Sequence, residues 1–326
     1  LMDAYPANQV FLPGMAHSSN DDFYVTDDFL AGTSQQDRNI YLFTVTQEPV
    51  LSSAWLNNYA VINRSNLVID LLKKLQVDQF NEQDLKDCLG HAYFLRACRL
   101  HSVAGLFALP YKLETAKETP GVPIRVTPDI NEPTTRGTLE DTYKQIEHDL
   151  LLAIELLPAQ PSAHYRPGRA AAFSLLAYVM LQKLEFGRAL EYAQQSLALQ
   201  NSLIDFNTIN LNASNSFALY NPEVLYQAQV SGQGQLGFNN WRVDTLLYRS
   251  YLPDDLRKAV FFRPNSSNSF GFKGDMGGMN DYDVFTGITI GETYLMAAEA
   301  AARAGNAALA MNYLNTLLIK RFRTGQ

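Results

Sequence analysis

The chain of 326 residues is long enough to bury a substantial hydrophobic core, in one large domain or two smaller ones. Its 47% hydrophobic and 18% charged residues are typical of a globular protein and argue against wholesale disorder. The formal net charge of −7 argues against nucleic acid as a partner, because binding to phosphates requires a basic surface.

The first predicted helices follow a long irregular segment. Residues 1–50 lack periodicity and are rich in Asp, Asn, Gly and Pro. From Ala54 onward, WLNNYAVINRSNLVIDLLKKL places apolar residues at helical spacing, and a second helix is expected from Glu82 to Leu106. Cys88 and Cys98 both fall on the second helix, about 15 Å apart along its axis. That is too far for a disulfide, so both are expected to be free, buried thiols.

The later helices have clear boundaries and occur in pairs. Thr138 and Asp141 have the spacing of a capping box, and Pro158 is expected to end the helix that they begin. Residues 169–200 and 292–320 each read as two helices joined by a short turn, with small residues in the first helix. Small residues let antiparallel helices approach closely, as in tetratricopeptide-type hairpins. The sequence therefore predicts a mainly α fold: a tetratricopeptide-like core of helix pairs (an α/α superhelix), overlaid by long irregular loops with a few short strands.

A GxGxxG pattern at Gly232, Gly234 and Gly237 raises the question of a dinucleotide site. That fingerprint works only in a βαβ unit, where the phosphate meets the N-terminus of the helix. No alternating pattern of strands and helices surrounds it here, so we interpret it as a glycine-rich loop that presents the residues after it.

Motifs for catalysis or metal binding do not stand out. The five histidines have no spacing such as HExxH, and neither a GxSxG elbow nor a P-loop occurs. The acidic run that includes Asp21 and Asp28 lacks the spacing of an EF-hand and is better explained as a solvated loop. We therefore predict no catalytic residues, no metal and no cofactor.

The order of the helical motifs resembles the SusD/RagB family of surface glycan-binding lipoproteins. The resembling residues include W-x3-Y-x2-I-x3-N from Trp55 to Asn66, A-x-FLRA from Ala92 to Ala97, and the LP–GVP connection that ends at Pro123. They continue with R-x-T-x4-Y-x2-I-x2-DL-x2-A-x3-LP from Arg136 to Pro158 and YL-x2-AEA-x-AR-x-G-x2-A from Tyr294 to Ala308. Each motif alone is weak, and their number and order make the match specific.

The resemblance implies a non-catalytic protein that captures oligosaccharide or polysaccharide and delivers it to a SusC-like TonB-dependent transporter. It implies a place on the outer membrane at the cell surface, held by a lipid anchor that is not present in this chain. We expect one domain over residues 1–326, with a helical scaffold at about 54–200 and 290–320. The loop-rich, ligand-facing parts are expected at about 1–50 and 201–290. The family's C-terminal segment is expected to be missing.

Sugars are bound by aromatic rings on their apolar faces and by amides or charged groups at their edges. The segment NNWR offers this combination in Asn239, Asn240, Trp241 and Arg242. Further candidates are Tyr248, Tyr282, Tyr41 and Asn58. The alternative for Trp241 is a loop residue packed into the core, and for the tyrosines it is ordinary packing.

Two other functions remain open. One is a helical-repeat scaffold that binds protein and has no affinity for sugars. The other is a carbohydrate-active enzyme whose paired carboxylates lie far apart in the sequence.

Overall fold

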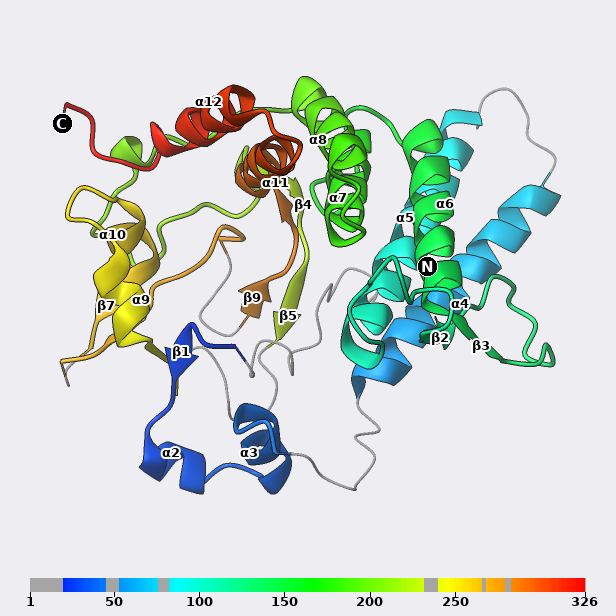
Figure 1. The fold of residues 1–326 in the computed structure, drawn as a ribbon, viewed down its shortest axis with the longest axis horizontal. Helices are drawn as coiled ribbons and strands as arrows, with labels where there is room; N and C mark the ends of the chain where they lie inside the picture. Colours follow the sequence, from blue (N-terminus) through cyan, green and yellow to red (C-terminus); the bar gives the residue numbers. More distant parts are fainter. Residues whose placement is uncertain are drawn as a thin grey trace.

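Long antiparallel helices form the body of the computed structural model, which describes residues 20–44, 53–75, 82–231, 240–265, 268–278 and 283–325. They are α4 (Ser53–Lys74), α5 (Glu82–Phe107), α6 (Leu139–Leu156), α7 (Arg169–Gln182), α8 (Phe186–Leu199), α11 (Ile290–Arg303) and α12 (Ala307–Leu318). Each packs against the next in this order, and α11 also packs on α7 (Figure 1). The last pair therefore continues the stack, although about ninety residues of chain separate α8 from α11.

The structure confirms the predicted mainly α fold with tetratricopeptide-like pairs, and α7–α8 and α11–α12 are the two pairs expected from the sequence. The Thr138–Asp141 capping box is formed, and α6 ends just before Pro158. Both cysteines are free, but only Cys98 is buried. The expectation that Cys88 is buried was wrong, because it lies on the outward face of α5.

Small residues allow the close packing at the centre of the stack. The alanines at the start of α7 are almost completely buried, as are Ala297 and Ala300 on α11. Between these two helices, the hydroxyls of Ser174 and Thr293 lie 2.7 Å apart and form a buried hydrogen bond. Because neither helix has bulky side chains at this contact, their backbones can approach closely.

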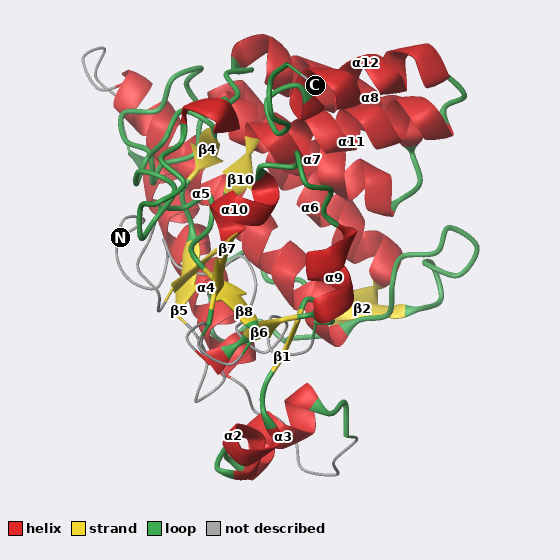
Figure 2. Ribbon diagram, turned by 90° about the vertical axis from the view of Figure 1, so that its left-hand side faces the viewer, coloured by secondary structure: helices red, strands yellow, loops and turns green. Residues whose placement is uncertain are grey.

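The remaining elements are short. Four helices of seven residues or fewer are described, together with one 3-10 turn: α2 (Asp27–Ala31), α3 (Gln35–Tyr41), α9 (Thr245–Ser250), α10 (Arg257–Phe261) and η1 (Phe206–Thr208). Within the part of the chain that the structure describes, the strands form two-stranded antiparallel pairs. These are β1 (Phe23–Tyr24) with β6 (Arg242–Val243), β2 (Pro120–Pro123) with β3 (Arg136–Thr138), β4 (Val224–Tyr226) with β10 (Ile288–Thr289), β5 (Gln229–Ser231) with β9 (Asp283–Phe285), and β7 (Phe262–Pro264) with β8 (Phe270–Phe272). Figure 2 shows that α2 and α3 lie beyond the strands, at the far end from the long helices.

A buried ion pair joins three helices of the stack. The Arg96 guanidinium on α5 donates from Nε and Nη2 to the two carboxylate oxygens of Asp149 on α6, at 2.7 and 2.6 Å. Its Nη1 donates to the side-chain oxygen of Asn66 on α4, at 2.9 Å. The Asn66 amide in turn donates to the carbonyls of Arg125 and Thr127. The loop after β2 is thereby attached to the helices.

A second buried ion pair attaches the long connection between α8 and α11 to the end of α12. Arg321 donates from Nη2 to the carboxylate of Glu223, and both side chains are buried. The same arginine donates to the carbonyl of Ile204 at 2.7 Å, and the amide of Ile204 donates to Glu223 at 2.9 Å. Each charge therefore also has a backbone partner, which offsets part of the cost of its burial.

Replacing Asp149 by Ala leaves the Arg96 charge buried without its ionic partner. We expect Asp149→Ala to lower the free energy of unfolding by about 3–5 kcal/mol, measured by urea denaturation. The control is Asp70→Ala, which removes the exposed ion pair between Asp70 and Lys74. That change is expected to cost no more than about 1 kcal/mol. An equal decrease in the free energy of unfolding in both variants would contradict a larger contribution of the buried ion pair.

Candidate functional site

Segments far apart in the sequence meet at the loop-rich end of the molecule. Strand β1 pairs with β6, so that Phe23 faces Val243 and Tyr24 faces Arg242. The amide of Asp244 also donates to the carbonyl of Asp22 at 2.9 Å. These contacts hold the described part of the N-terminal segment against the residues that follow the glycine-rich stretch.

Aromatic side chains from both segments form a continuous group, which we call the aromatic layer. Trp241 stacks on Phe23 with ring centroids 3.8 Å apart and meets Phe272 edge-on at 5.9 Å. Phe272 contacts Phe262, which contacts Tyr248. The aromatic layer consists of Phe23, Tyr41, Trp241, Tyr248, Tyr251, Phe262, Phe270 and Phe272.

The placement of Trp241 favours its alternative role in packing. Only 4% of the residue is exposed. It belongs to a small buried cluster with Phe23, Val25 and Val284. Stacking on a sugar requires an accessible ring face, and the stacked face here is covered by Phe23.

Tyr248 is half-buried, and its ring is also used within the protein. It stacks on Phe270 at 3.5 Å, and the Lys258 ammonium lies 4.4 Å from the ring centroid. Burial raises the pKa of the Tyr248 hydroxyl and also that of Tyr251. Both hydroxyls therefore remain protonated near neutral pH and can donate a hydrogen bond.

The other predicted residues have different positions. Tyr41 is half-buried at the edge of the aromatic layer, and its hydroxyl accepts from the amide of Val25 at 3.3 Å. Arg242 and Asn240 are half-buried beside Trp241, and Arg242 donates to the carbonyl of Trp241 at 3.4 Å. The structure thus brings Tyr41, Trp241, Arg242 and Tyr248 into one region. Asn239 and Tyr282 lie outside the described residues.

Asn58 does not join this region. It lies on α4, only 2% exposed, and its side-chain amide donates to the carbonyl of Ala54 at 2.7 Å. A side chain that bonds within its own helix and is buried has little surface to offer a ligand, so its placement favours a structural role.

The phenylalanines of β7 and β8 are the part of the aromatic layer that sequence reasoning missed. SFGF carries aromatic residues at alternate positions, a pattern of strands, and FFRP places two phenylalanines next to each other. The sequence pattern could therefore have indicated these strands, but it could not show which aromatic rings their phenylalanines would contact.

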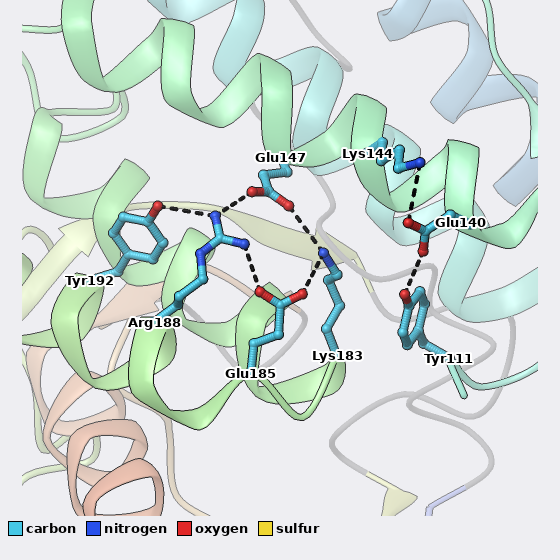
Figure 3. Close-up of polar contacts among 8 residues, drawn as sticks. All are labelled: Tyr111, Glu140, Lys144, Glu147, Lys183, Glu185, Arg188 and Tyr192. Atoms are coloured by element: carbon cyan, nitrogen blue, oxygen red, sulfur yellow. Dashed lines mark hydrogen bonds and ion pairs between the residues drawn. The ribbon is translucent and has the colours of Figure 1, made fainter. Parts of the chain in front are cut away.

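A charge network joins α6 to the turn between α7 and α8 (Figure 3). The Lys183 ammonium lies 3.1 Å from a Glu147 oxygen and 2.7 Å from a Glu185 oxygen. Arg188 pairs with the same two carboxylates and also donates to the Tyr192 hydroxyl. Burial opposes ionisation of Glu185, but hydrogen bonds from Lys183 and Arg188 outweigh it, so the pKa of Glu185 lies below its ordinary value of 4.5.

Glu140 lies on the same face of α6 and is also engaged. It accepts from the Tyr111 hydroxyl at 2.5 Å and pairs with Lys144 at 3.3 Å (Figure 3). The hydrogen bond from Tyr111 lowers the pKa of Glu140. A general acid for glycoside hydrolysis needs a raised pKa. The lowered pKa values of Glu140 and Glu185 therefore do not suit the role of the general acid, and both carboxylates are engaged in ion pairs.

The described residues contain no group of three or more His, Cys, Asp or Glu side chains arranged to hold a metal ion. None of their helices combines the length and the apolar character needed to cross a bilayer.

The packing role of Trp241 can be tested by truncation. We expect Trp241→Ala to lower the free energy of unfolding by about 3–5 kcal/mol, because it leaves a cavity between Phe23 and Phe272. Trp241→Phe, which keeps a ring at the position, is expected to cost clearly less. Urea denaturation measures both, and a loss below about 1 kcal/mol in Trp241→Ala would contradict the packing role.

The charge network predicts a dependence of stability on pH. Because the pKa of Glu185 is lowered in the folded state, its ionised form adds stability above about pH 4.5, and this contribution is lost as the pH falls through the folded-state pKa. We expect Glu185→Gln to unfold more easily at neutral pH, by about 1 kcal/mol or less. The difference from the wild type should shrink as the pH falls from 4.5 through the folded-state pKa of Glu185, because both side chains become neutral there. Urea midpoints across this range measure it, and a constant difference would rule out the ionic contribution.

Comparisons with known proteins give the family. A family model described as starch-binding and associating with the outer membrane matches residues 6–181, more than half of the chain. The curated SusD-like protein P2 of Formosa agariphila is 27% identical over 217 residues, which are 63% of this chain and 40% of that protein. The chain thus matches about two-fifths of the length of this relative.

Solved structures of similar proteins superpose on nearly the whole chain. A putative sugar binding protein from Bacteroides vulgatus superposes with a TM-score of 0.80 at 25% identity, covering 98% of this chain and 74% of that one. A SusD superfamily protein from Bacteroides thetaiotaomicron has the same fold, with a TM-score of 0.78 at 19% identity, covering 96% of this chain and 76% of that one. The family predicted from the order of the helical motifs is confirmed: the chain belongs to the SusD-like family.

Proposed function

We propose that this protein binds oligosaccharide or polysaccharide without turnover, at the outer surface of the outer membrane, and passes it to a SusC-like TonB-dependent transporter. The observation that carries the proposal is the match over more than half of the chain to a family described as starch-binding. The protein from Bacteroides vulgatus that it resembles is described as a putative sugar binding protein. A lipid anchor would hold the protein at the membrane.

The geometry of the loop-rich end supports sugar contact at polar edges. Arg242 and Asn240 are half-buried beside the packed ring of Trp241, and the hydroxyls of Tyr41 and Tyr248 lie at the margin of the aromatic layer. Packed rings hold these groups in place, and preorganised donors lose little freedom on binding. We propose that they, together with Asn239 and Tyr282, contact the glycan.

A second candidate is a scaffold that binds protein. The observation in its favour is a hollow of about 670 Å3 between α4, α5 and the loop after α6, partly lined by Leu71 and Leu75. These two leucines are 49% and 55% exposed. A protein of this kind would show no affinity for sugars.

Isothermal titration with maltoheptaose and laminarihexaose tests the proposal. Capture that allows release predicts a Kd from about micromolar to millimolar, or about −8 to −4 kcal/mol. Arg242→Ala is expected to bind at least about fivefold more weakly, a loss of about 1 kcal/mol. The matched control is Arg249→Ala, which removes an exposed arginine from α9 and is expected to bind as the wild type does.

The outcomes separate the candidate functions. Absence of binding to a broad panel of neutral and charged oligosaccharides would favour the protein-binding scaffold. Release of new reducing ends on long incubation would show turnover and overturn the non-catalytic assignment. Binding that is equal in the wild type and Arg242→Ala would keep the function and move the site away from Arg242.

A further inference from the structure

A separate hollow lies between the two helix pairs of the stack. Its volume is about 490 Å3, within the range of about 300–1,000 Å3 that is usual for sites of small ligands. The loop between α6 and α7 forms one wall, and residues 200–202 after α8 and 221–222 before β4 form the others. The apolar residues Pro161, Leu199 and Pro222, which are not buried, contribute to its lining.

The rim of this hollow carries neutral amides and a hydroxyl. Gln200 donates from Nε2 to the Oε1 of Gln160 at 3.0 Å, which links the loop after α6 to the end of α8. Each of these amides has further donor and acceptor capacity, because this bond uses one hydrogen of Gln200 and one lone pair of Gln160. Asn201 and Ser202 are exposed beside them. Among the described residues that line the hollow, none is Asp, Glu, Lys or Arg.

A pair of stacked rings stands at the same place. His164 lines the hollow, and its ring stacks on that of Tyr220 with centroids 5.1 Å apart and an interplanar angle of 14°. Tyr220 is 40% exposed and has a positive φ of 59°, a backbone conformation that a non-glycine residue adopts only where its surroundings hold it.

Backbone and side-chain contacts hold both walls. The amide of Gln227 donates to the carbonyl of His164 at 3.0 Å, which attaches the loop to the end of β4. On the opposite wall, the Asn221 side chain donates to the carbonyls of Ala218 and Met276, at 3.2 and 2.6 Å. These hydrogen bonds hold the segments that carry His164 and Asn221 in place. A ligand would therefore lose little free energy in ordering these segments on binding.

We propose that this hollow is a second binding site, for a short neutral saccharide of about two or three units, distinct from the loop-rich end. This inference rests on the proposed function for its ligand class. The apolar lining and the ring of His164 match the C–H faces of a sugar, and the neutral amides match its hydroxyls. Because the lining has no full charge to pair with a carboxylate, the site discriminates against uronic acids.

Hydrogen–deuterium exchange of the whole chain with maltotriose tests the site, because it reports where the ligand binds. We expect saturable protection of peptides that cover residues 158–166 and 199–203. In His164→Ala and Asn201→Ala the maltotriose concentration for half-protection should rise about tenfold, which corresponds to about 1.4 kcal/mol. The matched control is His148→Ala, an exposed histidine on α6 that does not line the hollow, and it should leave protection unchanged. Trigalacturonic acid, of the same length but with three carboxylates, should give no protection there.

The Arg242→Ala variant separates this inference from the proposed function. Protection of the hollow that persists in Arg242→Ala supports two independent sites. Protein that binds sugar by titration but shows no protection at residues 158–166 and 199–203 overturns the second site and leaves the function standing. Absence of any sugar binding overturns both.

Discussion

The structure depends on the burial of α7 among its neighbours. Helix α7 contacts α6, α8 and α11, and its residues from Ala170 to Ala172 are almost completely inaccessible. A helix packed in this way on several sides needs small residues, since bulky ones would force its partners apart. This contact also joins the two halves of the stack, because α11 returns to α7 after the long connection that follows α8. Helix α11 packs on both α7 and α8, so the C-terminal helix pair continues the core.

Buried charges attach the loops to that core. Arg96 and Asp149 join three helices and, through Asn66, hold the loop after β2. Glu223 and Arg321 do the same for the long connection and the end of α12. A buried charge without a partner is far more costly than an exposed one, so each of these pairs favours one arrangement of its segments over the alternatives. The loops of this protein are long, and these pairs limit the positions available to them.

The aromatic layer shows how packing and binding are divided at the loop-rich end. Trp241, its largest ring, stacks on Phe23, and Phe272 closes the edge of Trp241. The polar groups in the same region are the guanidinium of Arg242 and the hydroxyls of the half-buried tyrosines. A glycan at this end would therefore be recognised through its hydroxyl groups more than through its ring faces. The hollow beside His164 differs from this end, because it combines the ring of His164 and apolar residues with a rim of amides, so it could contact both the ring faces and the hydroxyl groups of a sugar.

The sequence by itself determined the long helices, the pairs α7–α8 and α11–α12, and the family. It missed the short helices α2 and α3, which lie in the segment predicted to be irregular. The helix cap at Thr138, the helix end before Pro158 and the small residues of α7 and α11 are local signals. They depend on residues that are close to each other in the sequence. Tertiary structure alone decided which aromatic residues are buried. Trp241 is covered by Phe23, more than two hundred residues earlier, and His164 meets Tyr220 across two loops. Whether a ring is available to a ligand depends on neighbours that are distant in the chain, and no local pattern encodes them.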